Sequence, residues 1–524
     1  MNPYEQVAQR LSQIKGFKPE KRPLIEEALD RILSSDTPFL VVQAPTGYGK
    51  TSISFSLALY SLQDASLFDR VIHVLPMRSI IEDIDRTAKE AFGFSRTKMM
   101  SSNEEFLHLF PLNITTVDTF TWDVLKLNTK KIPQIDRGRE FGYDYLTQAS
   151  ILTSLIIFDE AHFILEDPRM KTVFFSVLKF LAENNVPIVI MTATLSRGYI
   201  KLFEECTKKN NLEILSPNEE DPFIRRELRK EFEIKFQTGN PLDFVDNTKR
   251  VAIVANSVSR AVEIFDQAKE NAPELGFEED KIILIHGRMK PSHKAELIER
   301  LRKLNNEKSF LLIGTQAIEA GVDFSVDIMI TDAAPINSLL QRFGRVARYR
   351  ERKGEIIILE DAPTGPYSKE KIEKTVTLIK EAPGFNPRVP WTYQKIVNEV
   401  HGERKPEVMR GVNRSLMRKL HTLLKNPTKR SKDVLNEIKL ITKDEGPLLR
   451  GFLIPLEVEG EIVLISPKKL LELSKKGLVK VVAREREVSL CSFKDAYDVA
   501  KMIALGNPIT IKFTGEYDKE RGIV

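Results

Sequence analysis

Short apolar runs rich in Val, Ile and Leu recur along the first part of the chain, separated by longer stretches of alternating apolar and polar character. Strands buried on both faces show such continuous apolar runs, and amphipathic stretches between them are typical of crossover helices. A first series comprises FLVVQ (39–43), RVIHVLP (70–76), NITTV (113–117), SLIIFDE (154–160) and PIVIMTAT (187–194). This pattern predicts a doubly wound α/β domain around a parallel sheet.

A second series of the same kind begins near residue 250. Charged, strand-poor sequence between residues 216 and 245 separates it from the first. We therefore expect two tandem α/β domains, over residues 1–235 and 236–385. The runs of the second series are RVAIVANS (250–257), KIILIHG (281–287), SFLLIGT (309–315), VDIMITD (326–332) and GEIIILED (354–361).

The alternation stops beyond residue 385, where a Pro-rich, aromatic stretch follows. Residues 401–440 carry eleven lysines and arginines against four acidic residues. Two interpretations of this basic segment stay open, a solvated helical face and a phosphate-binding surface. Later runs such as GFLIPLEVEGEIVLISP predict short strands, so residues 386–524 are expected to form a small α+β accessory domain.

The composition narrows the classes of protein to which this chain can belong. The 524 residues include 79 Lys plus Arg and 74 Asp plus Glu, so the net charge of +5 permits polyanion binding without requiring it. Cys206 and Cys491 belong to no metal-binding or disulfide pattern. No apolar run approaches the roughly 20 residues of a membrane-spanning helix, and the N-terminus lacks a signal-peptide pattern. We expect a cytoplasmic protein without a membrane partner.

The stretch between the first apolar run and the next helical pattern matches a phosphate-binding loop, with alanine in the position of its first glycine. Two glycines allow the backbone to turn its N–H groups toward an anion. The lysine would reach the β and γ phosphates of a nucleoside triphosphate, and the following threonine hydroxyl would hold Mg²⁺. The loop residues are Ala44, Pro45, Thr46, Gly47, Tyr48, Gly49, Lys50 and Thr51.

Hydrolysis needs further groups, and two stretches offer them. Asp159 and Glu160 follow an apolar run, so Asp159 is expected to hold Mg²⁺ and Glu160 to act as the base that activates water. A strand cap is the alternative. In QRFGRVAR (341–348), Arg345 and Arg348 would share one side of a helix and stabilise phosphoryl transfer, unless they form only a basic helix face.

Taken in order, these stretches resemble the motifs of superfamily 2 helicases with the DEAH form of motif II. The motifs are APTGYGKT (I), LPMRS (Ia), TTVDT (Ib), DEAH (II), TATLS (III), VAIVANS (IV), GTQAIEAGVDF (V) and QRFGRVAR (VI). The resemblance implies two RecA-like domains, ATP as the nucleotide, and nucleic acid bound across both domains.

Further roles come from the resemblance alone. It implies that Arg345 and Arg348 act across the nucleotide cleft, that Gln341 orders the γ-phosphate side, and that Asp323 lies on the nucleotide side. Coupling of hydrolysis to movement is implied for His162, Thr192 and Thr194. Contacts to the nucleic-acid backbone are implied for Arg78, Thr116, Asn256, His286, Gly287 and Thr315. For Thr116 or Asn256 alone, a turn or cap role is the simpler interpretation.

Within the superfamily, the sequence is most similar to the CRISPR-associated helicase of type I systems, the motor recruited by the Cascade surveillance complex. This likeness implies action on single-stranded or R-loop DNA, with 3′ to 5′ movement and Cascade as a partner. Two departures stand out. Arg22-Pro23 is followed by Leu24 and Ile25 where many relatives carry a glutamine that contacts adenine. The chain also has no His-Asp dipeptide, so a separate HD nuclease subunit is expected to cut the DNA.

Other functions remain open at this point. A DNA-repair or RNA helicase of the same superfamily would carry the same motifs, since backbone contacts do not reveal how the 2′-hydroxyl is treated. A nucleotide-gated scaffold without turnover is a third candidate. The basic segment 401–440 is a candidate to bind DNA, the nuclease subunit or Cascade.

Overall fold

The computed structural model divides into two compact units, Met1–Arg225 with His401–Arg450 and Arg226–Val400 with Gly451–Val524. Each unit is built around its own parallel sheet. The described residues are 2–15, 20, 22–35, 39–76, 78–92, 95–98, 107–128, 131–207, 212–319, 322–349, 351–445, 448–449, 453–483, 486–504 and 509–524.

The seven strands of the first unit run parallel in the order β3-β4-β2-β5-β6-β1-β7. Val41 lies in one core cluster and its neighbours Leu40 and Val42 in another, because successive side chains point to opposite faces of a sheet. Both faces are therefore buried. The strands are β1 (Phe39–Gln43), β2 (Arg70–Leu75), β3 (Ser95–Lys98), β4 (Leu112–Thr116), β5 (Ser154–Phe158), β6 (Ile188–Thr192) and β7 (Glu213–Leu215).

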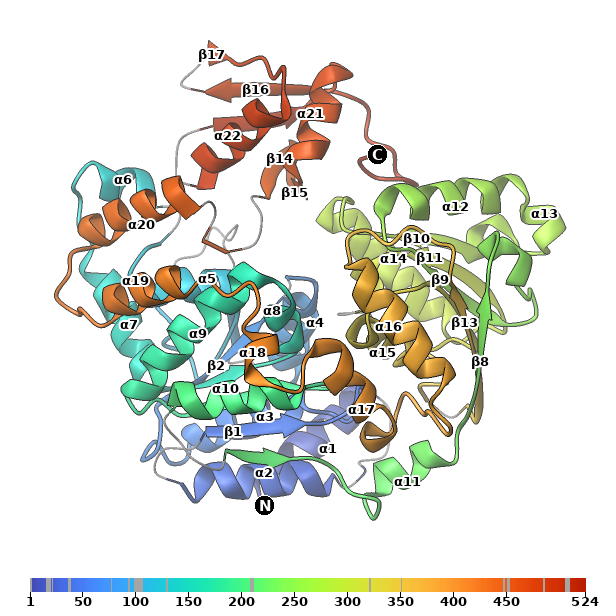
Figure 1. Cartoon of the computed structure of the whole chain (residues 1–524), viewed down its shortest axis with the longest axis horizontal. Coiled ribbons are helices and arrows are strands. Elements are labelled where there is room, and N and C mark those ends of the chain that lie inside the picture. Colours follow the sequence, from blue (N-terminus) through green and yellow to red (C-terminus); the bar gives the residue numbers. More distant parts are fainter. Residues whose placement is uncertain are drawn as a thin grey trace. The chain divides into compact units, whose positions relative to one another are not determined.

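Helices cover the two faces of this sheet with their apolar sides. This arrangement confirms the predicted doubly wound fold for the first series of strands (Figure 1). The helices are α1 (Pro3–Lys15), α2 (Pro23–Leu33), α3 (Thr51–Ser61), α4 (Arg78–Phe92), α5 (Val117–Val124), α6 (Ile132–Asp136), α7 (Gly142–Leu152), α8 (His162–Glu166), α9 (Pro168–Glu183) and α10 (Arg197–Thr207).

The basic segment also belongs to this first unit. It forms α18 (Lys405–Val408), α19 (Arg414–Leu424) and α20 (Ser431–Glu445), and α19 packs along α9 (Figure 1). Apolar side chains of α19 and α20 enter the core on one face of the first sheet, because both helices are amphipathic. The buried Lys171 of α9 donates to the carbonyl oxygen of Val408 at 2.7 Å.

The large sheet of the second unit has six described strands, also parallel, in the order β10-β11-β9-β12-β13-β8. Its strands are β8 (Glu231–Gln237), β9 (Arg250–Val254), β10 (Ile282–Ile285), β11 (Phe310–Gly314), β12 (Ile328–Asp332) and β13 (Lys353–Leu359). Its helices are η2 (Pro241–Phe244), α12 (Val258–Glu270), α13 (Ala272–Leu275), η3 (Glu279–Lys281), α14 (Pro291–Leu304), η4 (Gln316–Ile318), α15 (Ile336–Phe343), α16 (Lys369–Lys380) and α17 (Pro390–His401).

Residues 454–513 build a smaller mixed sheet with its own apolar core, in the order β15-β14-β18-β16-β17. The predicted α+β character of this region is confirmed. Its elements are β14 (Ile454–Val458), β15 (Glu461–Ile465), α21 (Pro467–Lys475), β16 (Val479–Ala483), β17 (Arg486–Glu487), α22 (Phe493–Ala504) and β18 (Ile509–Phe513).

The division into units differs from the boundaries expected at residues 235 and 385. Strand β8 starts at Glu231 and pairs along its whole length with β13, so the second unit begins earlier. Helix α17 buries Tyr393 and Ile396 in the second unit's core, and the chain then returns to the first unit. Local composition did not reveal this return, because the apolar partners of α19 lie more than 200 residues upstream.

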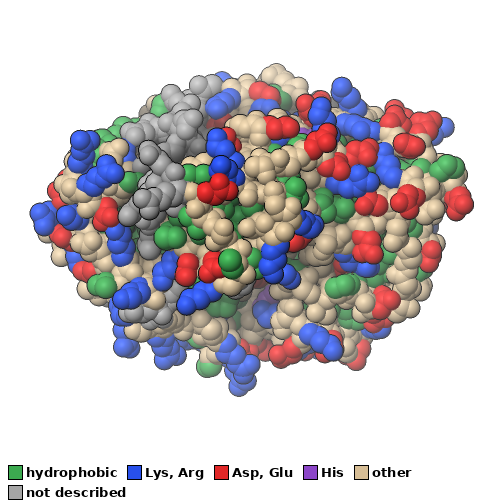
Figure 2. All heavy atoms as spheres, turned by 90° about the horizontal axis from the view of Figure 1, so that it is seen from above, with side chains coloured by type: hydrophobic (Ala, Val, Ile, Leu, Met, Phe, Trp, Pro, Cys, Tyr) green, Lys and Arg blue, Asp and Glu red, His purple; other side chains and the backbone are tan. Residues whose placement is uncertain are grey.

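Charged side chains of both signs are interspersed on the face shown in Figure 2. Within the described part of the chain, no helix is both long and apolar enough to cross a membrane.

Candidate nucleotide site and strand-facing residues

The phosphate-binding loop lies directly after β1, at the carboxyl edge of the first sheet. Gly47 and Gly49 adopt φ values of 82° and 97°, a left-handed conformation that favours glycine. Ala44 donates its N–H to the carbonyl of Thr192 at 3.0 Å, which fixes the loop to β6. Lys50 is buried and its Nζ donates to the Ala44 carbonyl at 3.1 Å. Thr51 then opens α3, as the motif predicts.

The acid pair lies at the end of β5, on the same edge of the sheet. The Lys50 Nζ atom is 3.5 Å from Glu160 Oε1. Asp159 accepts a hydrogen bond from the Glu160 N–H at 2.8 Å. Glu160 has a φ of 48°, which is unfavourable for a residue with a side chain and marks a constrained turn. The lysine and both acids predicted to act on the nucleotide are therefore gathered at one place.

A histidine that sequence reasoning missed holds Asp159 in place. His73 of β2 is fully buried, with Nε2 3.2 Å from Asp159 Oδ2 and Nδ1 2.9 Å from the Ser54 hydroxyl. Burial opposes ionisation of Asp159, but the hydrogen bond from His73 and the charge of Lys50 hold the pKa of Asp159 below its ordinary value. The signal was present as a lone histidine inside the apolar run RVIHVLP, yet only pairing with β5 shows its partner.

The electrostatics of Glu160 differ from those of its neighbour. Burial raises the pKa of Glu160 above its ordinary value, and the adjacent charge of Asp159 adds to this, against the opposing charge of Lys50. A carboxyl group with a raised pKa is a better proton acceptor, which suits a base that activates water.

The three residues expected to couple hydrolysis to movement form one chain of hydrogen bonds. His162 Nδ1 lies 3.1 Å from the Thr192 hydroxyl, which donates to the Thr194 carbonyl at 2.9 Å. His162 is also 3.4 Å from Glu160 Oε2. Burial lowers the pKa of His162 to about 3, so this imidazole is neutral near pH 7. Motifs II and III are thus directly connected inside the first unit.

The second unit gathers the charged residues of motifs V and VI. Arg345 Nη2 donates to the Glu319 carbonyl at 2.6 Å, and Arg348 Nε lies 3.4 Å from Asp323 Oδ1. Asp323 also accepts a hydrogen bond from the Tyr349 hydroxyl at 2.9 Å. Asp323, predicted on the nucleotide side, therefore pairs with a predicted catalytic arginine.

Arg342 was not selected from the sequence, although it lies within motif VI. It is fully buried on α15, beside the equally buried Gln341, and pairs with Glu319 at 2.8 Å. Its guanidinium also donates to the Thr331 hydroxyl at 2.7 Å and to Asn256 Oδ1 at 3.1 Å. Arg342 thereby connects motifs IV, V and VI. Removing one partner of such a buried ion pair destabilises a protein strongly, because the other charge stays buried without compensation.

Two of the residues expected to face nucleic acid act as helix caps at the ends of strands. Thr116, the last residue of β4, accepts from the Thr119 N–H at 3.2 Å and caps α5. Thr315 begins η4 directly after β11 in the same way. Capping is the role that the simpler interpretation gave to Thr116, and contact with nucleic acid stays a prediction for both.

The remaining strand-facing residues are held differently. Asn256 Nδ2 donates to the carbonyls of Ala333 and Pro363, and its Oδ1 accepts from Arg342. His286 is fully buried, with Nε2 2.8 Å from the Arg521 carbonyl, whereas Gly287 is exposed. Arg78 starts α4, but its side chain lies outside the described residues.

The structure shows what occupies the position at which many relatives carry a glutamine that contacts adenine. Ile25 is fully buried on α2, and a Cβ built on Gly49 would lie 3.8 Å from its Cδ1 atom. Arg22 Nε donates to the carbonyl of Tyr48 at 3.0 Å. An apolar side chain with no hydrogen-bonding group thus packs near the phosphate loop at this position.

Comparisons with known proteins agree with this geometry. Residues 22–202 match the family model described as DEAD/DEAH box helicase. Residues 247–351 match the one described as CRISPR-associated nuclease/helicase Cas3, C-terminal. The chain resembles the Cas3 helicases. The resemblance to superfamily 2 helicases that the motifs indicated is confirmed.

One relative is the CRISPR-associated helicase Cas3 of Thermoproteus tenax, 26% identical over 70% of this chain and 64% of that protein. The chain therefore spans less than two thirds of that Cas3 relative. The fold is similar to the crystal structure of T. fusca Cas3, with a TM-score of 0.59, 17% identity and coverage of 95% and 64% of the two chains. A chain in a structure titled "CRISPR RNA-guided surveillance complex, pre-nicking" has a TM-score of 0.54, 18% identity and coverage of 86% and 59%.

These likenesses to Cas3 confirm the predicted fold, two RecA-like sheets followed by a smaller sheet. Within the described ranges, no group of three or more His, Cys, Asp or Glu side chains is placed to hold a metal ion.

Proposed function

We propose that this chain is an ATP-driven DNA motor of a type I CRISPR interference system, which translocates along or unwinds target DNA. The observation that carries the proposal is the meeting of Lys50 and Glu160, 3.5 Å apart at the carboxyl edge of the first sheet. A phosphate-binding lysine alone would suit a nucleotide-binding scaffold. A base beside it is what turnover needs.

The residues of the first unit fit a bound magnesium triphosphate. Gly47 and Gly49 shape a loop whose N–H groups suit an anion, and Lys50 is already directed back over that loop. The Thr51 hydroxyl and the carboxylate of Asp159, oriented by His73, would hold Mg²⁺. Bound Mg²⁺ would neutralise charge on the β and γ phosphates. Glu160 would accept the proton of the attacking water.

Positive charge from the second unit would complete the reaction. Arg345 donates to the Glu319 carbonyl, while the side chain of Arg348 is 20% exposed and pairs with Asp323. Arginine suits phosphoryl transfer because it stays charged and presents a planar fork of donors. We assign Arg348 as the principal stabiliser of the transferred phosphoryl group and Arg345 as its support, with Gln341 ordering the γ-phosphate side.

Nucleic acid would be gripped through its backbone. Thr116 is the last residue of β4, and Thr315 and Gly287 follow β11 and β10. At these carboxyl ends of strands, hydroxyl and backbone N–H groups can contact phosphates in any sequence. We extend the same role to Arg78, Asn256 and His286. Movement would follow from hydrolysis through His162, Thr192 and Thr194, which already share hydrogen bonds.

The partners follow from the likeness to Cas3. A structure titled as an RNA-guided surveillance complex contains a chain of this fold, which supports a Cascade-type complex as the loader of this motor. We further propose 3′ to 5′ movement on single-stranded or R-loop DNA, and a separate HD nuclease subunit for cleavage. The basic helix α19 offers exposed Arg414, Arg418 and Lys419 as a surface for DNA or Cascade.

The test is ATP hydrolysis without nucleic acid, with single-stranded DNA and with single-stranded RNA. Wild type is compared with Glu160→Gln, and exposed Glu90→Gln on α4 serves as the matched control. Stimulation by DNA that is lost in Glu160→Gln and kept in Glu90→Gln supports the DNA motor. Stimulation by RNA instead would identify an RNA helicase.

Absence of turnover under every condition, with ATP still bound, would favour the scaffold. The partner surface is tested separately by changing Arg414, Arg418 and Lys419 to Glu. If neither DNA affinity nor assembly with the surveillance complex changes, α19 is not that surface.

A further inference from the structure

The segment that leads into Arg348 has an unusual backbone. Ala347 adopts a φ of 46°, in the left-handed region that costs free energy for any residue with a Cβ. Its N–H donates to the Val326 carbonyl at 3.0 Å, and the N–H of Arg348 donates to the Ser325 hydroxyl at 2.9 Å. These bonds hold the N–H side of the segment. The carbonyls of Val346 and Ala347 need other hydrogen-bond donors if the turn is to keep this conformation.

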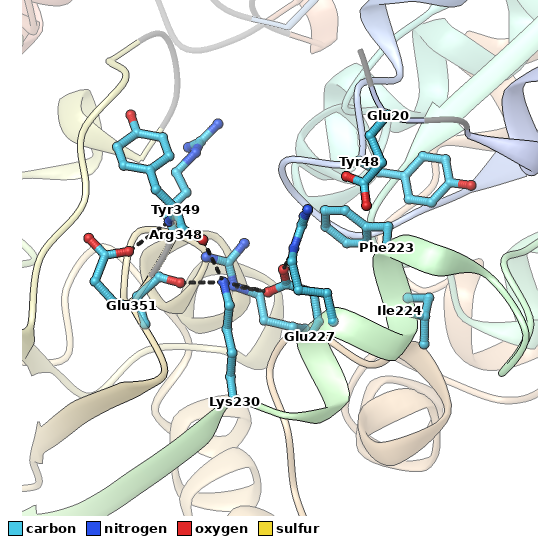
Figure 3. A network of polar contacts seen from close by, with 12 residues as sticks. Glu20, Tyr48, Phe223, Ile224, Glu227, Lys230, Arg348, Tyr349 and Glu351 are labelled. Atoms are coloured by element: carbon cyan, nitrogen blue, oxygen red, sulfur yellow. Dashed lines mark hydrogen bonds and ion pairs between the residues drawn. The ribbon is translucent and has the colours of Figure 1, made fainter. Parts of the chain in front are cut away.

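Two remote cations supply those partners. Lys230 Nζ donates to the Ala347 carbonyl at 2.5 Å, and Arg388 Nη2 donates to the Val346 carbonyl at 3.1 Å. Lys230 follows α11 (Pro222–Leu228), and Arg388 lies just before α17. Figure 3 shows Lys230 reaching from the end of α11 toward the chain at Arg348. Three separate segments of the second unit thus meet at these two carbonyls.

The cations are buried together with a single acid. The side chains of Lys230, Glu227 and Arg388 are exposed by 4%, 1% and 1%. Lys230 lies 3.0 Å from Glu227 and Arg388 lies 3.9 Å from it, and the exposed Arg226 also pairs with this carboxylate at 3.2 Å, so three positive charges share it. Burial lowers the pKa of Arg388 to about 10 and also lowers the pKa of Lys230. Burying an excess of positive charge lowers the stability of the folded state. If this region only stabilised the core, apolar side chains would do so at a lower desolvation cost.

The two carbonyls flank the residue that precedes Arg348. Fixing them fixes the direction in which the Arg348 side chain leaves the backbone, while its guanidinium stays partly exposed. We infer that Lys230 and Arg388 are positioning residues, which hold the backbone at Val346 and Ala347 so that Arg348 presents its charge to the transferred phosphoryl group. This inference rests on the proposed ATP hydrolysis.

The first test is kinetic and uses Lys230→Met in the full chain. We expect kcat for DNA-stimulated ATP hydrolysis to fall about 10- to 100-fold, since a small misplacement of a catalytic group has effects of this size. KM for ATP should change less than about threefold, and Lys230→Arg should restore much of kcat. Lys235→Met is the control, because Lys235 is 39% exposed and pairs with Glu233 of its own strand and Glu355 of β13.

Measuring Lys230→Met in the Arg348→Ala variant distinguishes a role that acts through Arg348 from a purely structural role. If Lys230 acts through Arg348, adding Lys230→Met to Arg348→Ala should lower kcat less than about twofold. An equal loss in both backgrounds would overturn the proposal. Should Lys230→Met prevent folding, the pair Glu227→Gln with Lys230→Met removes the buried Lys230–Glu227 ion pair and is tested in the same way.

A second measurement does not depend on turnover. Hydrogen exchange of the Ala347 and Arg348 amides should be at least about tenfold faster in Lys230→Met than in wild type, and unchanged in Lys235→Met. Unchanged exchange would overturn the positioning role whether or not the chain hydrolyses ATP. Faster exchange in a chain without ATP hydrolysis would instead disprove the proposed function while keeping the backbone contact.

Discussion

Glu160 in the first unit and Ala347 in the second both have positive φ values, 48° and 46°, beside the charged groups of the nucleotide motifs. The two turns are held differently. Glu160 is fixed by near neighbours at the sheet edge, through Asp159 and Lys50. Ala347 has no polar side chain; its N–H donates to the Val326 carbonyl and its carbonyl accepts from Lys230, which follows α11.

The difference reflects where each turn lies. The end of a parallel strand already brings neighbouring strands together, so His73 of β2 reaches Asp159 beside β5 without extra elements. The segment after α15 leaves its helix; it pairs with Val326 through backbone hydrogen bonds, and the carbonyls of Val346 and Ala347 accept from Arg388 and Lys230. The acid pair is thus oriented by side chains at the same edge of its sheet, whereas the carbonyls of the arginine segment are held by Lys230 and Arg388. Four measurements test the roles assigned to these groups.

The largest effect is expected from Glu160→Gln. Removing the base should lower DNA-stimulated kcat about 10³-fold, because proton transfer by a positioned side chain contributes on this scale. The amide keeps the shape of the side chain, so ATP affinity measured by equilibrium binding should change little. A variant that retains more than a tenth of wild-type kcat would remove Glu160 from the role of base.

Arg348→Ala should have the next largest effect. Loss of one positive group at the developing charge is expected to lower kcat about 10²-fold. Arg345→Ala should cost less kcat, because its guanidinium is already bonded to the Glu319 carbonyl, but it should lower thermal stability more. Equal kinetic losses in the two variants, measured under saturating ATP, would contradict this division of roles.

The pH dependence of kcat should show a smaller, several-fold effect. Burial raises the pKa of Glu160, and below that pKa the carboxyl is protonated and cannot accept a proton. The rate should therefore fall as the pH falls, at a pH above the ordinary glutamate pKa of about 4.3. His162, with a pKa of about 3, stays neutral over this range, so His162→Asn should leave the midpoint of the acid limb unchanged. A midpoint that moves in His162→Asn would assign the titration to the histidine.

The smallest effect is expected from Tyr48→Phe in the phosphate loop. The Tyr48 hydroxyl donates to Asp221 Oδ2 at 2.5 Å in the interior of the first unit. Its removal should lower the free energy of unfolding by about 1 to 3 kcal/mol, because Asp221 loses a buried donor. Urea denaturation measures this change, and kcat should stay within about twofold. A large kinetic loss at unchanged stability would give the tyrosine a role in catalysis.

The sequence alone was sufficient for the features that depend on local pattern. Apolar runs predicted the strands β1, β2, β4, β5 and β6, and Gly47, Gly49 and Lys50 identified the phosphate loop, because a strand, a tight turn and a helix start are encoded within about a dozen residues. The acid pair was found by the same reasoning, since it follows directly after an apolar run.

The groups that hold these motifs come from distant parts of the sequence, and the folded structure was needed to identify them. His73 meets Asp159 through strand pairing, and Lys230 meets Ala347 across 117 residues of sequence. The helix α19 returns to the first unit because its apolar face matches α9, although its charge alone indicated a surface segment. Hydrophobic periodicity reports which face of an element is buried but not what covers it, and a charge in the sequence does not reveal its partner. Long-range packing provides both.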